Sequence, residues 1–271
     1  LPTREQFQKA KQSYAYETGK FHLAIAGASG AGKSSLVNAL RGLRDSEGGA
    51  AEVGVVETTS KIKRYPEPDK SLPFVWFDVP GAGTLNVPRA EYFNNMGLYL
   101  LDAIIVVYND RFTDTDIAIT RNCVCYDIPC YIVRSKSDVH ITNLARASMT
   151  ETDDEAEPSK ADIQRAKAVY EGQTRENVRD SLREADLPMN SKLYLVSNRC
   201  IRPLVKAGKE GRPIADVKSP FMLDEGKLLE DLLLDATARR PPRSYESVIA
   251  GLRGQIKRLI SGGRQWFKSQ G

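Results

Sequence analysis

Residues 27–34 of the chain read Gly27-Ala28-Ser29-Gly30-Ala31-Gly32-Lys33-Ser34, which matches the P-loop pattern GxxxxGK[ST]. The apolar run at 21–26 before it has the composition of a buried strand, and residues 34–43 after it have the apolar spacing of a helix. A glycine-rich turn between a strand and a helix is the setting in which backbone N–H groups converge on phosphate oxygens. The segment therefore predicts a nucleotide-phosphate site.

Each residue type in this loop has a part in holding a triphosphate and Mg²⁺. The glycines let the main chain approach the phosphates, Lys33 neutralises the β and γ charges, and the Ser34 hydroxyl is a magnesium ligand. The expected nucleotide contacts from the loop are Gly27, Ser29, Gly30, Ala31, Gly32, Lys33 and Ser34.

Two later segments are expected to reach the same metal. Asp78 ends an apolar strand and opens the sequence Asp78-Val79-Pro80-Gly81, and a carboxylate at such a place needs a cation, which Mg²⁺ supplies. Gly81 then places its N–H beside the γ-phosphate. Residues 54–59 form a switch loop whose threonine reaches the metal, and we favour Thr59 over Thr58 because neighbours in an extended segment point to opposite sides. The predicted metal ligands are thus Ser34, Thr59 and Asp78.

A second motif is expected to recognise the base of the nucleotide. Ser135-Lys136-Ser137-Asp138 resembles the guanine-binding motif [NT]KxD, with serine at its first position. Asp138 can accept hydrogen bonds from the N1 and N2 protons of guanine, whereas adenine lacks this donor pair and leaves the carboxylate unpaired. Lys136 lies along the base plane. Ser197 and Asn198 follow the last apolar strand and occupy the position of a fifth guanine-contacting loop.

The order of apolar segments predicts an α/β fold. Strands alternate with helices, which indicates a mostly parallel six-stranded sheet with helices on both faces, as in a Ras-like P-loop domain, together with short flanking helices. We expect an N-terminal flanking helix within 1–20, the nucleotide domain over 21–238 and a basic amphipathic helix within 239–271. The expected strands are 21–26, 61–65, 74–77, 103–108, 130–134 and 193–196, the expected helices are 3–18, 34–43, 89–101, 114–126, 160–185 and 221–236, and the expected irregular segments are 149–159 and 206–219.

Several segments together resemble the immunity-related GTPases, an interferon-inducible family with a Ras-like domain flanked by helices. They are GASGAGKSSLVNALRG, EGGAAEVGVVETT, FVWFDVPGAGT, VYNDRFTDTDIAI, YIVRSKSDVHITN and YLVSN, and the similarity runs from residue 1 to about 200. The resemblance implies a GTPase that self-associates in a nucleotide-dependent way and acts in cell-autonomous defence or at intracellular membranes. It adds Ser35 to the phosphate contacts. The family's sizeable helical domain is expected to be absent or reduced, because 71 residues follow Cys200.

Hydrolysis raises a question at position 82. Ras-type proteins orient the attacking water with a glutamine directly after the DxxG glycine, but this chain has Ala82 there. We expect a low intrinsic rate and consider Glu57 as the group that positions the water, with an ordinary solvated glutamate as the alternative. The expected catalytic set is Lys33, Glu57, Thr59 and Gly81, and a second subunit docked across the nucleotide face would complete it.

The net charge of +4 is concentrated at the end of the chain. Residues 237–271 hold eight basic side chains and one acid, Glu246. The predicted helix over 245–268 has an apolar stripe that either packs on the domain or lies on an anionic membrane, and we favour packing. A nucleic-acid partner is not expected because the basic residues are confined to one helix. Four scattered cysteines and the lack of a secretory signal favour a cytoplasmic protein, with peripheral contact to intracellular membranes.

Three functions compete at this stage. The first is an active GTPase that binds GTP or GDP with Mg²⁺ and forms homodimers or larger oligomers. The second is a binding module that bound nucleotide switches between conformations and that hydrolyses GTP negligibly, as Ala82 would permit. A P-loop ATPase or kinase is the third, and Asp138 disfavours it.

Overall fold

The computed structural model describes residues 2–54, 61–69, 72–81, 89–149, 157–213 and 216–239. Apolar β-branched and aromatic residues make up most of the strands, which explains why they pair at the centre of the molecule. The strands are β1 Phe21–Ala26, β2 Lys63–Pro66, β3 Phe74–Asp78, β4 Ala103–Tyr108, β5 Cys130–Arg134 and β6 Lys192–Leu195. They confirm the six strands expected from the sequence to within two residues at each end.

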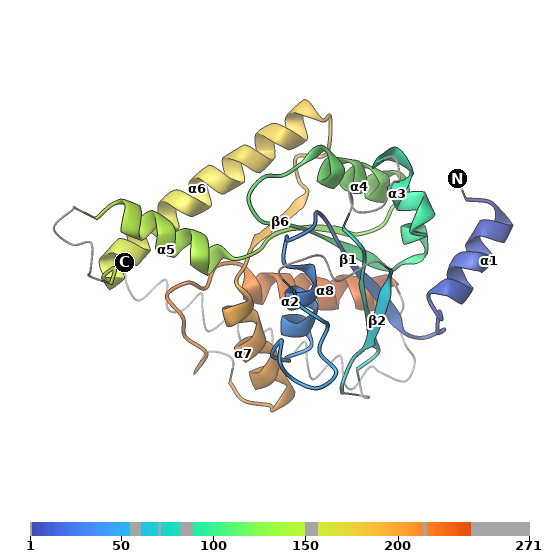
Figure 1. The fold of residues 1–271 in the computed structure, drawn as a ribbon, viewed down its shortest axis with the longest axis horizontal. Helices are drawn as coiled ribbons and strands as arrows, with labels where there is room; N and C mark the ends of the chain where they lie inside the picture. The colour runs from blue at the N-terminus through green and yellow to red at the C-terminus, as the bar shows by residue number, and fades with distance from the viewer. Residues whose placement is uncertain are drawn as a thin grey trace.

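All strands belong to one sheet with the order β2-β3-β1-β4-β5-β6. Among the described strands only the edge strand β2 runs antiparallel, against β3, while the other four pairings are parallel. Parallel pairing requires a crossover between strands, and helices provide it here (Figure 1). The mostly parallel α/β sheet predicted from the sequence is therefore confirmed.

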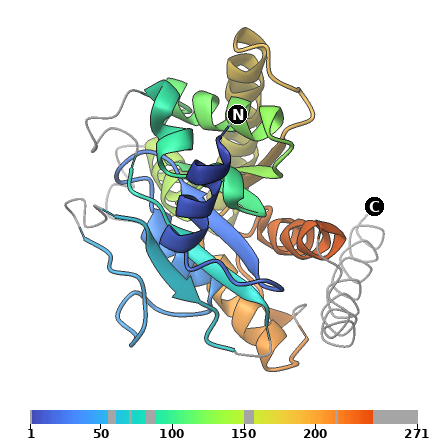
Figure 2. The same cartoon turned by 90° about the vertical axis from the view of Figure 1, so that its right-hand side faces the viewer.

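Helices cover both faces of the sheet. They are α1 Arg4–Ser13, α2 Lys33–Leu40, α3 Arg89–Asn95, the 3₁₀ turn η1 Leu98–Leu100, α4 Asp114–Cys125, α5 Ser137–Ala147, α6 Lys160–Glu184, α7 Asn198–Lys209 and α8 Glu225–Arg239. One core joins α1, α3, η1, α4 and the end of α6 to the sheet, and the other joins α2, α7 and α8 to the opposite face. Figure 2 shows the two layers of helices with the sheet between them.

Side chains that alternate along each strand point to opposite faces of the sheet and so belong to two separate cores. On β1, Ala24 and Ala26 face the first core, whereas Leu23 and Ile25 face the second, and all four are almost fully buried. The period of two is what a strand buried on both faces requires. A third, smaller core lies between α5, α6 and the end of β6.

Helix α1 packs into the first core. The Tyr14 ring, 2% exposed, meets the ring of Phe77 edge-on at 4.8 Å between centroids, and its hydroxyl donates to the Met96 carbonyl at 2.7 Å. Helix α1 ends at Ser13, earlier than the expected residue 18, because Ala15 adopts a left-handed conformation with φ +44°.

Two helices were missed by the sequence analysis. Helix α5 begins within the predicted base loop, and α7 begins at Asn198 in the other one. Since α7 continues to Lys209, the expectation of irregular structure from residue 206 was wrong for its first four residues. Its apolar residues are spaced to bury Cys200, Ile201, Leu204 and Ala207 against α2, and this packing extends the helix past Pro203.

Candidate nucleotide-binding site

The P-loop is seated on the sheet by a contact that only glycine permits. Gly27 directly follows β1 and has φ +138°. A Cβ atom built on it would lie 2.1 Å from the carbonyl oxygen of Val107 on β4. The close approach fixes the start of the loop against the neighbouring strand. Gly27 therefore fixes the position of the P-loop relative to the end of β4.

Two more glycines shape the loop itself. Gly30 has φ +74° and no neighbour within 4 Å of its would-be Cβ, so its backbone is open on the side away from the protein. Gly32 has φ +90° and caps helix α2, which begins at Lys33. The N-terminus of α2, where the helix dipole is positive, thus borders the loop, which is the arrangement that binds phosphate.

Lys33 and Ser34 lie where the motif requires them. The Lys33 side chain is 7% exposed, and its ammonium donates to the Ala28 carbonyl at 2.9 Å, so it bends back over the loop. The Ser34 hydroxyl donates to Oδ2 of Asp78 at 2.5 Å. The predicted hydroxyl and carboxylate ligands are thus brought together, and two hard oxygen donors beside a phosphate loop fit Mg²⁺. The Ser35 hydroxyl instead donates to Oδ2 of Asp45 at 3.1 Å, so it does not join Ser34 at the Asp78 carboxylate.

The segment after β3 is anchored from both sides. Val79 donates its N–H to the Ile25 carbonyl at 3.1 Å, and the Tyr92 hydroxyl donates to the Pro80 carbonyl at 2.7 Å. Gly81, buried, is the last described residue of this segment. The turn from Asp78 to Gly81 therefore has a fixed start beside the P-loop.

The base loop is joined to the phosphate loop directly. The Ser135 hydroxyl, 1% exposed, donates to the Ala31 carbonyl at 2.7 Å. Lys136 has φ +58° and directs its ammonium to the Gly30 carbonyl at 3.3 Å. The sequence analysis placed Ser135 at a motif position without a role, and the structure gives it one. Its hydrogen bond to Ala31 fixes the distance between the predicted base loop and the P-loop.

Asp138 and the loop after β6 form the other side of the base site. Asp138 is 8% exposed, and the exposed Arg199 places a guanidinium nitrogen 3.8 Å from its Oδ2. Ser197 accepts the N–H of Arg199 at its hydroxyl, and its own N–H donates to the buried Glu225. Oδ1 of Asn198 has no hydrogen-bond partner among the described residues. Arg199 and Glu225 were missed by the sequence analysis because neither belongs to a motif.

A second acid lies near the P-loop lysine. Asp116 on α4 is fully buried, and its Oδ2 accepts the N–H and the hydroxyl of Thr113 at 2.9 and 2.7 Å. Burial raises the pKa of Asp116, and the nearby charge of Lys33 opposes this shift. The capping box that it forms with Thr113 starts α4.

Comparison with known proteins agrees with this geometry. The model of the family described as Interferon-inducible GTPase (IIGP) matches residues 8–202, which include the P-loop, both base loops and the aspartate at the end of β3. The chain belongs to the interferon-inducible GTPase family. The resemblance seen in the sequence is thereby confirmed.

Individual relatives show the same relationship over shorter segments. Interferon-inducible GTPase 1 of Mus musculus is 38% identical over 130 residues, which are 48% of this chain and 31% of that protein. Immunity-related GTPase family M protein 3 of Mus musculus is 30% identical over 182 residues, or 67% of this chain and 38% of that protein. The chain thus spans about a third of these relatives. A bacterial selenocysteine-specific elongation factor matches 71% of this chain and 28% of its own at 16% identity with a TM-score of 0.40, which is too weak to add to the assignment.

Some predicted site residues lie outside the described ranges. They are the switch residues Glu57, Thr58 and Thr59, together with Ala82 and the predicted helix over 245–268. Their roles stay predictions. No helix in the described residues is long and apolar enough to cross a membrane, and those residues hold no cluster of three or more metal-binding side chains.

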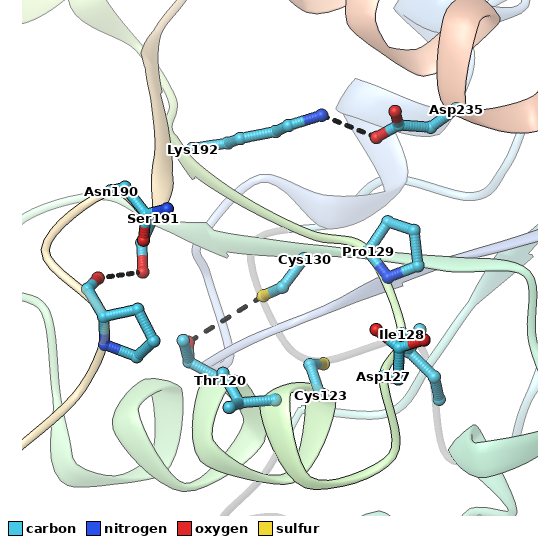
Figure 3. A pocket seen from close by; sticks show the side chains of 12 residues that line it. Thr120, Cys123, Asp127, Ile128, Pro129, Cys130, Asn190, Ser191, Lys192 and Asp235 are labelled. Atoms are coloured by element: carbon cyan, nitrogen blue, oxygen red, sulfur yellow. Dashed lines mark hydrogen bonds and ion pairs between the residues drawn. The ribbon is translucent and has the colours of Figure 1, made fainter. Parts of the chain in front are cut away.

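A pocket of about 500 Å³ lies elsewhere, at the beginnings of β5 and β6 (Figure 3). Several of its polar side chains contact one another or the backbone. Lys192 pairs with Asp235 at 2.6 Å, Ser191 donates to the Pro188 carbonyl, and the Cys130 thiol lies 3.9 Å from the Thr120 hydroxyl. In a parallel sheet ligands bind at the carboxyl ends of the strands, so this pocket is not the nucleotide site.

The contact beneath Gly27 yields a prediction about stability. Gly27→Ala should lower the free energy of unfolding by about 3 kcal/mol or more, because its Cβ collides with backbone that cannot move aside. Gly48→Ala is the matched control, since nothing lies within 4 Å of its would-be Cβ, and it should change stability by less than about 0.5 kcal/mol. Urea unfolding of both variants measures the difference. Equal stability of the two would contradict the account of the loop.

Proposed function

We propose that this chain binds GTP with Mg²⁺ and hydrolyses it to GDP and phosphate. Its membership of the interferon-inducible GTPase family supports the proposal. The observation that carries it is the hydrogen bond from Ser135 to Ala31, which sets a guanine-selecting aspartate at a fixed place relative to a P-loop. Because the chain spans about a third of its relatives, the activity itself is inferred from the site.

The residues of the site have separate tasks in this reaction. Lys33 and the N–H groups from Gly30 to Ser34 stabilise negative charge on the phosphate oxygens, and Ser34 and Asp78 hold the metal. Bound Mg²⁺ supplies charge neutralisation between the β and γ phosphates. Asp138 accepts the two guanine protons, and Lys136 covers the base. These tasks are positioning and electrostatic stabilisation, which account for most of the catalysis of phosphoryl transfer.

The attacking water requires a group that position 82 does not provide. Alanine can neither donate nor accept a hydrogen bond, so the Ras-type arrangement is excluded by the sequence. Glu57 is the nearest carboxylate of the predicted switch loop and the candidate for orienting the water. We infer a slow reaction in the isolated subunit.

Single-turnover phosphate release distinguishes an active enzyme from a switch that hydrolyses negligibly. With excess protein over GTP in magnesium buffer, the native chain should convert the bound GTP to GDP. Lys33→Ala should slow this conversion by at least about a hundredfold, because it removes the cation from the phosphates. Lys9→Ala, an exposed lysine of α1, serves as the control and should leave the rate unchanged. Release no faster from the native chain than from Lys33→Ala would favour the binding module.

We further propose that two subunits associate across the nucleotide face. Support comes from Ala82, which leaves the isolated site without the Ras-type glutamine, and from the exposed edge of the site at Ser29 and Gly30. A docked subunit would exclude water from the phosphates and order the switch loops, both of which raise the rate.

Specific activity therefore depends on protein concentration. Phosphate released per subunit and per minute should rise as the chain is concentrated over about a hundredfold range at saturating GTP. In each dilution, an inert protein is added so that the total protein concentration stays constant, which controls for adsorption and crowding. Specific activity that stays flat across the range would remove the second subunit from the mechanism.

A further inference from the structure

The loop that carries Ser197 and Asn198 leaves the outer edge of the sheet. Strand β6 is an edge strand, with β5 on its inner side only. Val196 turns inward and donates its N–H to the Arg134 carbonyl at 2.9 Å. The N–H groups of Leu195 and Ser197 point outward, where the sheet offers no acceptor.

Two consecutive carboxylates occupy this outer edge. Oδ2 of Asp224 accepts the N–H of Leu195 at 2.9 Å, and Oε1 of Glu225 accepts the N–H of Ser197 at 2.9 Å. The second oxygen of Glu225 accepts the N–H of Leu223 at 2.6 Å. Their spacing matches the alternation of a strand, so the start of α8 continues the hydrogen bonding of β6 up to the base loop.

Glu225 differs from its neighbour in burial. It is fully buried, whereas Asp224 forms an ion pair with Arg175 of α6 at 2.7 Å and is partly exposed. A buried carboxylate is costly, and here it is held by two backbone N–H groups, one of them 28 residues away along the chain. If Glu225 only capped α8, its local bond from the Leu223 N–H would be enough, and the bond from the Ser197 N–H would not be needed. The bond to Ser197 is what ties α8 to the guanine site.

We propose that Glu225 is a positioning residue for guanine recognition, fixing the loop of Ser197 and Asn198 opposite Asp138. The inference rests on the proposed function, because it concerns how the same site selects its base. Without Glu225 the N–H of Ser197 has no acceptor and the loop gains freedom. Asn198, whose Oδ1 has no protein partner among the described residues, then no longer faces the base at a fixed distance.

The charges around Glu225 give the sign of a pH effect. Burial is the main cause that raises its pKa to about 7, and the adjacent Asp224 adds to this shift, while the bonds from Ser197 and Leu223 oppose it. Cys200 of α7 and Tyr170 of α6 also face it, and both stay neutral in this range because their pKa values are raised. His140 of α5 has a lowered pKa and stays neutral above pH 7.

Protonation of Glu225 should therefore loosen the loop as the pH falls through about 7. The folded pKa lies above that of an unfolded glutamate, so this group's contribution to the unfolding free energy becomes more favourable over the same fall in pH. As the pH falls, base selectivity should thus decrease while this contribution to stability increases. A carboxylate with only a structural role would change stability with pH but leave base selectivity unchanged.

The test measures dissociation constants for GDP and ADP in magnesium buffer on the full chain. Glu225→Ala should reduce the preference for GDP by about tenfold or more, since two buried N–H groups lose their acceptor. Leu232→Ala, which removes apolar packing from the same helix, is the control and should lower stability while keeping the native preference. A native preference in Glu225→Ala would overturn the inference.

A conservative variant keeps the test decisive if Glu225→Ala does not fold. Glu225→Gln retains one acceptor and cannot ionise, so its preference for GDP should be reduced and constant between pH 6 and 8, whereas that of the native chain should rise. The same profile in both proteins would overturn the inference. If the native chain itself does not prefer GDP over ADP, the proposed function fails and the inference fails with it.

Discussion

A hydrogen bond from the buried Ser135 hydroxyl to the Ala31 carbonyl holds the phosphate loop and the base loop in one frame. A nucleotide has a fixed length between its base and its phosphates, so a site that reads both needs its two loops at a set distance. Gly27 fixes the same frame from below, where its missing Cβ leaves room for the Val107 carbonyl. The sheet therefore determines where the nucleotide lies.

Both predicted base loops depend on more distant parts of the chain. Ser197 is held by Glu225 of α8, and the hydroxyl of Ser137 lies 3.0 Å from that of Tyr170 of α6. Both partners are buried and come from helices that follow the base-reading aspartate in sequence. The C-terminal third of the described chain thus holds both predicted base loops in place as well as completing the fold. This arrangement joins nucleotide recognition to the packing of α6 and α8.

Much of the fold and of the phosphate site was predictable from the sequence, because the signals are local. The apolar run at 21–26 predicts a buried strand, and the glycine pattern directly after it predicts a P-loop. Helices α5 and α7 were not predicted, since both begin inside polar motifs that indicate loops. Glu225 could not be found either. Its partner is 28 residues away, and a glutamate before an amphipathic helix is ordinarily a solvated first-turn residue.

The central claim is that one rigid frame binds a triphosphate and selects guanine. Calorimetric titration of the nucleotide-free chain with GTP and with ATP in magnesium buffer tests it most directly. We expect one GTP site per chain and an affinity for ATP at least about a hundredfold weaker, because Asp138 would be left without its two donors. Equal affinities for the two nucleotides, or no binding of either, would contradict it.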